Sequence, residues 1–330
     1  MPTPVGGPFF DELAVGMTFE SAPALTLTDG LAATHRSILG DRLRLSLDHE
    51  LSRAVTGAPT PLASPSLVWD VAIGQSTLAT HHVKANLFYR GLRFHRFPHL
   101  GDTLRTHTEA VGLRQNSAKP GRAATGLAVL RMTTTDQHGA TVLDFYRCAM
   151  LPLGQSPAPG RHAPDQDLTT IGVDQGTAWA APAGWDLAEF QACVPERHDG
   201  ASLVGRTFAT SGDVVSSAPE LARLSLNIAA VHHDERGAGS RLVYGGHTIG
   251  LALAQLTRAL PDLVTVLGWE SCDHTGPVHE GDTLTSEIEV LGCTALAEGH
   301  AVPLRSVVTA HTLSGEPRPV LDWRFTALFA

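Results

Sequence analysis

One stretch of the chain combines residue types that could move a proton and bind a negatively charged oxygen. Asn227 precedes His232 by five positions, and the pair Gly245-Gly246 follows at the start of an apolar segment. An imidazole titrates near neutrality and suits proton transfer, whereas an amide can only orient a partner. Backbone N–H groups at a helix N-terminus bind anionic oxygens, and glycine permits close approach. The pattern therefore predicts a proton-transfer site beside an oxyanion-binding helix end.

The same residues allow simpler interpretations, which stay open at this point. Asn227 and His232 could only cap turns and satisfy buried backbone groups, and the glycine pair could be an ordinary turn before a helix. His232, His233, Asp234 and His247 could also be metal ligands. Adjacent histidines rarely face one ion, however, and these four residues contain no HxxxH spacing. No metal is therefore expected.

The composition limits the class of protein. The chain has 330 residues, enough for two domains of about 150 residues. Apolar residues make up 43% and charged residues 17%, which suits globular cores, and a net charge of -9 argues against general nucleic-acid binding. The sequence shows no apolar run of the roughly 18 residues that span a membrane, no signal-peptide pattern and no CxxC pair. A cytoplasmic protein without nucleic-acid or membrane partners is expected.

Three short segments occur twice, in the same order and at a nearly constant spacing. They are Val15–Phe19 and Val204–Phe208, Gly101–Leu104 and Gly281–Leu284, and Val142–Phe145 and Val320–Trp323. The period is far too long for a solenoid, so two copies of one domain are the simplest explanation. The predicted boundaries are 1–153 for the first domain, 154–195 for a linker and 196–330 for the second domain.

Each copy is expected to contain one apolar helix followed by strands. The first helix begins at Ser64-Pro65, a favourable N-cap followed by a proline at the first helical position, and the second follows Gly245-Gly246. Strand patterns cover 103–111, 126–134, 284–291 and 302–312, and a short helix is expected near 185–190. This arrangement indicates an α+β fold rather than βαβ units.

With these residues in view, the chain resembles the MaoC-type hydratases of the hotdog fold, and within them the mesaconyl-CoA hydratases, also called β-methylmalyl-CoA dehydratases. The resemblance covers nearly the whole chain. It is carried by segments 101–104, 112–116, 227–232, 243–247 and 320–322. It implies a double hotdog, in which each antiparallel sheet wraps around one long helix. It also implies a single working copy, because the residues around Asp48 and His49 do not keep the Asn227–His232 spacing.

The resemblance further implies a hydro-lyase that reversibly adds water to an enoyl-CoA, most specifically mesaconyl-CoA to give β-methylmalyl-CoA. Asn227 and His232 would hold the water, while Gly245 and Gly246 would bind the thioester oxygen. It implies no cofactor besides the CoA thioester substrate, and a homodimer is one assembly it allows. The alternatives are a general (R)-specific enoyl-CoA hydratase, a hotdog thioesterase, a non-catalytic acyl-thioester binding protein or a scaffold subunit. The lack of an acidic residue at position 227 weighs against the thioesterase.

A carboxylated acyl group and the CoA phosphates both need cationic partners, and the guanidinium group suits both. Arginines are dense around position 90 for so acidic a chain, and another lies just before the glycine pair. A solvated basic face is an equally simple explanation for part of this density. The predicted substrate-binding residues are Arg90, Arg93, Arg114, Arg241, Tyr244 and His247.

Overall fold

The computed structural model describes residues 6–117, 120–154, 166–173, 178–194, 198, 200–236, 239–312 and 315–330. The first half contains a long buried helix between several short helices and a group of long strands. Its elements are η1 (Phe10–Glu12), β1 (Thr18–Phe19), β2 (Leu25–Thr26), α1 (Asp29–Leu39), α2 (Arg44–Leu47), α3 (His49–Thr56), α4 (Pro65–Gln75), η2 (Ser76–Thr80), β3 (Ala85–Phe94), β4 (Thr103–Gln115), β5 (Thr125–Thr135) and β6 (Thr141–Pro152).

The second half repeats this plan after a connecting segment. Its elements are α5 (Leu187–Ala192), α6 (Gly200–Leu203), β7 (Thr207–Ala209), β8 (Asp213–Val214), α7 (Ala218–Leu224), η3 (Ala230–His232), α8 (Gly245–Ala259), β9 (Leu263–His274), β10 (Thr283–Val290), β11 (Thr294–Ala295), β12 (His300–His311) and β13 (Arg318–Phe329). The strands and helices predicted from the sequence are confirmed. The long strands β3, β6, β9 and β13 and the helices α1, α2, α3, α6 and α7 were not predicted.

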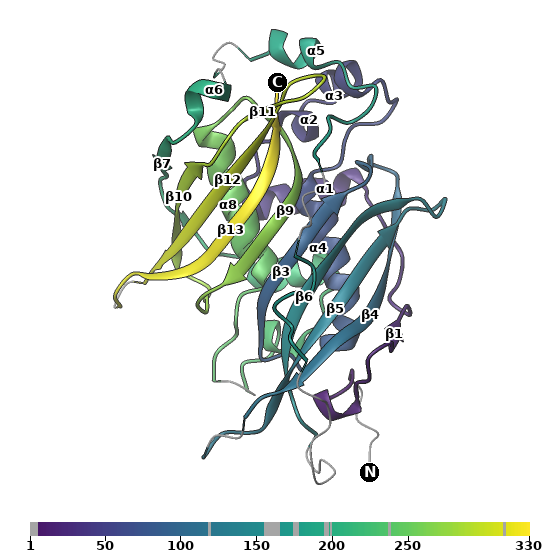
Figure 1. Ribbon diagram of the computed structural model, residues 1–330, viewed down its shortest axis with the longest axis vertical. Helices are drawn as coiled ribbons and strands as arrows, with labels where there is room; N and C mark the ends of the chain where they lie inside the picture. Colours follow the sequence, from purple (N-terminus) through teal and green to yellow (C-terminus); the bar gives the residue numbers. More distant parts are fainter. Residues whose placement is uncertain are drawn as a thin grey trace.

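One antiparallel sheet joins the two halves. Its strand order is β1-β4-β5-β6-β3-β9-β13-β12-β10-β7, with β2, β8 and β11 paired beside this path. The halves meet where β3 pairs with β9, with Phe88 opposite Asp273 and Leu92 opposite Trp269. Helices α4 and α8 contact each other on the same side of the sheet (Figure 1). Each half is thus a sheet wrapped around one long helix, which confirms the predicted double hotdog.

The repeated sequence segments occupy equivalent places in the two halves. The Gly-Asp-Thr-Leu segments enter β4 and β10, and the glycine of each has a positive φ, 101° and 91°. The aspartate of each segment accepts a hydrogen bond from a backbone N–H three residues earlier, Asp102 from His99 at 2.9 Å and Asp282 from His279 at 3.0 Å. The same local structure at both places supports the duplication inferred from the sequence.

The two long helices are buried on nearly all sides. Every residue of α4 is buried, as expected for a helix wrapped by a sheet. Pro65 is its first residue, as predicted, but Ser64 does not cap the helix with its side chain. The Ser64 hydroxyl instead hydrogen-bonds the Asp41 carboxylate at 2.5 Å. No helix among the described residues is long and apolar enough to cross a membrane.

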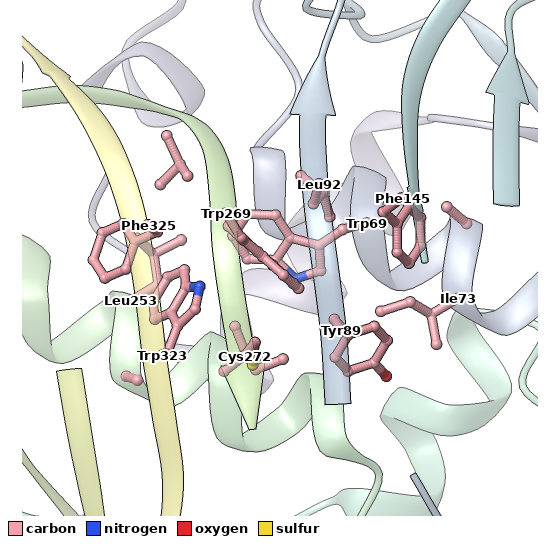
Figure 2. Close-up of a cluster of buried hydrophobic side chains, with 14 of the residues drawn as sticks. Trp69, Ile73, Tyr89, Leu92, Phe145, Leu253, Trp269, Cys272, Trp323 and Phe325 are labelled. Atoms are coloured by element: carbon pink, nitrogen blue, oxygen red, sulfur yellow. The ribbon is translucent and has the colours of Figure 1, made fainter. Parts of the chain in front are cut away.

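Three tryptophans connect the halves through a shared core. The ring of Trp69, on α4, lies 4.8 Å from that of Trp269, on β9, and 6.1 Å from that of Trp323, on β13. Both contacts have the edge-to-face geometry that aromatic rings favour. Figure 2 shows this cluster between the helices and the central strands. Because the helix of the first half packs on strands of the second, neither half is expected to keep its core alone.

The connecting segment covers one end of the sheet. Residues 155–165, 174–177 and 195 of the predicted linker lie outside the described residues. The predicted short helix is present as α5, which lies beside α3 (Figure 1). Trp185, Leu187 and Phe190 are buried in one apolar cluster with Val264 and Leu267 of β9. This part of the linker is therefore integrated into the core of the protein.

Gly74, on α4, provides a test of this packing, because it lies against the chain just before Asn227. A Cβ at this position would stand 1.7 Å from the carbonyl oxygen of Ser225. Gly74→Ala should therefore lower the free energy of unfolding by about 1–3 kcal/mol or more. Gly30→Ala, on α1, is the control, since its Cβ would meet nothing within 4 Å. Measured by urea denaturation, Gly30→Ala should leave the free energy of unfolding unchanged or raise it by up to about 1 kcal/mol. Equal decreases in the free energy of unfolding of both variants would contradict the packing.

Candidate active site

A cavity of about 300 Å³ opens between the two halves. Its walls come from η2, β3 and β6 of the first half and from the 227–232 loop, the start of α8 and the end of β9 in the second. The lining includes one glycine of α8 and several polar side chains: Thr77, Thr80, Tyr89, Arg147, Asn227, His232, Tyr244, Gly245, Thr248 and His274. The structure thus brings four predicted site residues together, Asn227, His232, Tyr244 and Gly245.

Asn227 is held in one orientation by its own loop. Its side-chain Oδ1 accepts a hydrogen bond from the Ala229 N–H at 3.0 Å, which identifies the other amide atom as the nitrogen. No protein acceptor for Nδ2 is found in the described part of the chain. The preceding residue, Leu226, adopts a left-handed backbone with φ of 62°, which is strained for a leucine. Asn227 therefore presents an N–H donor, and no basic group, at the cavity wall.

His232 offers the complementary group, an unprotonated ring nitrogen. Its Nδ1 lies 2.9 Å from the carbonyl oxygen of Leu242, so Nδ1 carries the hydrogen and Nε2 keeps its lone pair. Burial lowers the pKa of His232 to about 4, which keeps the ring neutral at pH 7. The ring lies edge-on to Tyr244, with centroids 5.8 Å apart. A proton acceptor and an amide donor thus line the same cavity.

The first half holds the loop that carries both residues. The Thr77 hydroxyl, on η2, accepts a hydrogen bond from the Ile228 N–H at 3.0 Å, and the His81 carbonyl accepts one from the Ala230 N–H at 2.9 Å. Within the second half, His233 Nε2 donates to the carbonyl oxygen of Asn227 at 2.7 Å. His233, considered in the sequence analysis only as a possible metal ligand, therefore positions Asn227.

The N-terminus of α8 lies beside this cavity. The helix begins at Gly245, which lines the cavity, and Tyr244 provides no side-chain cap. The first N–H groups of a helix have no partner within it and favour negative charge. Side chains would not fit here: a Cβ on Gly245 would stand 2.7 Å from the His274 ring, and one on Gly246 would stand 2.1 Å from Asp70 Oδ1. Gly246 does not itself line the cavity.

A buried carboxylate, not predicted from the sequence, supports the cavity wall from behind. Asp70, on α4, accepts hydrogen bonds from the Tyr244 hydroxyl at 3.0 Å and from His35 Nε2 at 2.9 Å. All three side chains are almost fully buried. Burial raises the pKa of Asp70, while both hydrogen bonds oppose that shift. The arrangement fixes the ring of Tyr244 against His232.

Two further polar residues of the cavity also escaped prediction. His274, at the end of β9, is buried, which lowers its pKa to about 4, and its Nε2 has no partner within the described residues. Arg147, on β6, is only 4% exposed. The sequence did contain a signal for Arg147. When the repeated segments starting at Val142 and Val320 are aligned, Arg147 falls opposite Phe325, so the two copies differ sharply at this position.

The predicted substrate-binding arginines lie elsewhere. Arg90 pairs with Asp273 at 2.7 Å, and the Arg93 guanidinium lies 4.1 Å from the centre of the Trp179 ring. Arg114 is partly exposed on β4. None of the three belongs to the described residues that line the cavity.

Arg241 and His247 are also outside the cavity lining. Arg241 is exposed and lies 3.5 Å from Glu280, although its neighbour Leu242 does line the cavity. His247 is completely buried within α8, where neither ring nitrogen has a hydrogen-bond partner among the described residues. No group of three or more His, Cys, Asp or Glu side chains suited to a metal ion was found in the part of the chain that the structure describes.

Comparison with known proteins places the chain in a family. No family model matches it. It is 30% identical to the β-methylmalyl-CoA dehydratase of Chloroflexus aurantiacus, covering 98% of this chain and 97% of the relative. The chain belongs to this MaoC-like dehydratase family. A mesaconyl-CoA hydratase of Cereibacter sphaeroides is 26% identical over 94% of this chain and 91% of its own length. The family member described here is accordingly a hydro-lyase of the hydratase/dehydratase type.

Solved structures agree on the fold. A conserved hypothetical protein of Mycobacterium tuberculosis, described as having a double hotdog fold, is 62% identical with a TM-score of 0.94, and 99% of each chain is covered. A protein described as a MaoC-domain dehydratase from Chloroflexus aurantiacus is 27% identical with a TM-score of 0.80, covering 98% of this chain and 97% of the other. The double hotdog is thus shared over the full length.

The buried His247 should make the protein sensitive to acid. Burial lowers its pKa to about 4, whereas the unfolded chain titrates near 6.5. Between these values the unfolded state binds more protons, so stability falls as pH falls, by up to about 1.4 kcal/mol per pH unit for one group. His247→Leu should reduce this slope, and His49→Leu, at an exposed site, should not. Unfolding free energies measured from pH 7 to 4 test this, and an unchanged slope in His247→Leu would refute it.

Proposed function

We propose that this hydro-lyase adds water to the double bond of an enoyl-CoA, and that mesaconyl-CoA, giving β-methylmalyl-CoA, is its specific substrate. One observation carries the proposal: a neutral His232 with a free Nε2 lines the same cavity as an amide donor and a helix N-terminus. The acyl group is suggested by the names of the two curated relatives.

In the proposed mechanism, Asn227 and His232 hold the attacking water between them. The water oxygen accepts a hydrogen bond from Asn227 Nδ2, and one water proton points at His232 Nε2. As His232 takes that proton, the hydroxide oxygen bonds to Cβ and the double-bond electrons move toward the thioester oxygen. The protonated His232 then returns its proton to Cα, which restores the neutral ring.

The start of α8 stabilises the charge that develops during this step. The free N–H groups at its first turn, with Gly245 at the cavity wall, donate to the thioester oxygen as it becomes an enolate. A donor of this kind typically contributes roughly 10²–10³-fold to the rate. The proton that leaves water ends on the substrate, so the proposed reaction balances with the chain's own groups and one water, and uses no cofactor.

The apolar lining of the cavity suits an acyl chain whose CoA portion lies outside the cavity. Most of the lining surface is apolar, with Val83, Leu87, Val231 and Val278 among its residues. Lys84 is exposed and also belongs to the lining, so a cationic side chain lies between the cavity and solvent. A cation there suits the phosphates of CoA.

The thioesterase alternative has less support. Such an enzyme would need a carboxylate near the thioester as a nucleophile or base. None of the described residues that line the cavity is Asp or Glu. The nearest carboxylate that the structure places behind the wall, Asp70, is occupied by Tyr244 and His35.

His232→Ala should reduce turnover by roughly 10²-fold or more, because it removes the only group proposed to carry the proton. Asn227→Ala should also be severe, since the water loses its donor. His49→Ala is the matched control in the first half and should keep full activity. The decrease in enoyl-thioester absorbance with mesaconyl-CoA measures all three, and full activity in His232→Ala would exclude the mechanism.

A further inference from the structure

We propose that Arg147, from the non-catalytic first half, binds a carboxylate on the acyl group and so selects dicarboxylic acyl-CoA substrates. The inference rests on the proposed function, since it takes the cavity to be the acyl-CoA site. Arg90, Arg93 and Arg241, which were predicted to bind substrate, do not line the cavity. Arg147 does, and it is therefore the better candidate for binding the acyl carboxylate.

Arg147 is a buried cation with neutral partners. It is 4% exposed, and its guanidinium donates to the hydroxyl groups of Thr80 and Tyr89. Its Nε has no hydrogen-bond partner among the described residues, and no described carboxylate pairs with it. Burial consequently lowers the pKa of this arginine. A cation removed from water without a counter-ion is unfavourable, so an anion entering the cavity would be bound strongly.

The protein does not supply that anion from its nearest buried carboxylate. Asp70 directs Oδ2 to His35 and Oδ1 to the Tyr244 hydroxyl, at 2.9 and 3.0 Å. Arg147, in contrast, lines the open space. A guanidinium binds a carboxylate through paired, charge-assisted hydrogen bonds, which makes a carboxylate the ligand group best suited to this position.

The location of Arg147 matches the chemistry of the proposed substrate. In β-methylmalyl-CoA the carbon that bears the hydroxyl group also bears the free carboxylate. A carboxylate bound to Arg147 must therefore lie next to the groups that deliver water. Arg147 and His232 line the same cavity, and the charge of Arg147 contributes to the lowered pKa of His232. One ligand in this cavity can therefore contact both side chains.

The duplicated half shows that the fold does not require an arginine here. The equivalent residue, Phe325, is buried and stacks on Trp323 with ring centroids 3.8 Å apart. An apolar side chain therefore satisfies the same strand position when no ligand is bound there. A buried charge that the architecture does not need, placed at the wall of the working cavity, is explained by ligand recognition.

Carboxylate binding would also tune the catalytic histidine. In the free enzyme, burial and the positive charges around it, including that of Arg147, disfavour protonated His232. A substrate carboxylate neutralises Arg147 and favours the protonated form. The acidic limb of kcat, which reports the complex, should then lie at higher pH than that of kcat/KM, which reports the free enzyme. Crotonyl-CoA, which has no carboxylate, should show a smaller separation.

The test compares Arg147→Met and Arg147→Lys with Arg131→Met. Arg131 is 45% exposed on β5 and pairs with Asp144, away from the cavity. Hydration is measured with mesaconyl-CoA and crotonyl-CoA, and binding with the unreactive methylsuccinyl-CoA and butyryl-CoA. Arg147→Met should lower kcat/KM for mesaconyl-CoA at least about 100-fold and change crotonyl-CoA less than about threefold. Arg147→Lys should fall between, because it keeps the charge but loses the paired geometry, and Arg131→Met should behave as wild type.

The outcomes separate this inference from the proposed function. If the unaltered enzyme hydrates neither enoyl-CoA but binds methylsuccinyl-CoA at least about tenfold more tightly than butyryl-CoA, and Arg147→Met removes that preference, hydration fails and the carboxylate site stands. The unaltered enzyme alone can also refute the carboxylate site, even if no Arg147 variant folds. It would do so if it hydrates mesaconyl-CoA less efficiently than crotonyl-CoA, or binds methylsuccinyl-CoA less tightly than butyryl-CoA. Equal losses with both substrates in a folded Arg147→Met would also overturn it.

Discussion

The antiparallel pairing of β3 with β9 is the constraint on which the site depends. This register places the start of β3, with Tyr89, beside the end of β9, with Cys272 opposite it and His274 just beyond. Both long helices then lie under one continuous sheet, and the start of α8 comes up against residues of the first half. A slip of one residue would turn every side chain of one strand to the opposite face. The loop that carries Asn227 and His232, the start of α8 and Arg147 would then no longer line one cavity.

The connecting segment packs at the other end of β3 and β9. Trp185 and Phe190 share one apolar cluster there with Leu267 of β9 and Leu51 of α3. A separate cavity remains beside this cluster, and Phe94, Trp185 and Leu267 are among the residues that line it. Asn227 and His232 do not line this cavity, so the two ends of the central strand pair differ in their chemistry.

Local patterns were enough to predict α4, α5 and α8, four of the long strands and the duplication, because these depend on spacing within short segments. They also singled out Asn227 and His232, which line the same cavity. The partners across the fold were not predictable in this way. Asp70 and Arg147 reach the site only through α4 and β6 of the other half. The density of arginines around position 90 was misleading because successive strand residues face opposite sides. Tyr89 faces the core with its cross-strand neighbour Arg147, while Arg90 pairs with Asp273 outside it.

The first residue of α4 shows how far the two copies have diverged. Where α8 begins with Gly245, α4 begins with Pro65, which has no backbone N–H to offer an anionic oxygen. The first copy therefore does not repeat the helix end that Gly245 brings to the cavity wall. It contributes to that cavity in another way, through side chains of η2, β3 and β6. The two copies have thus become complementary: each supplies a different part of one cavity.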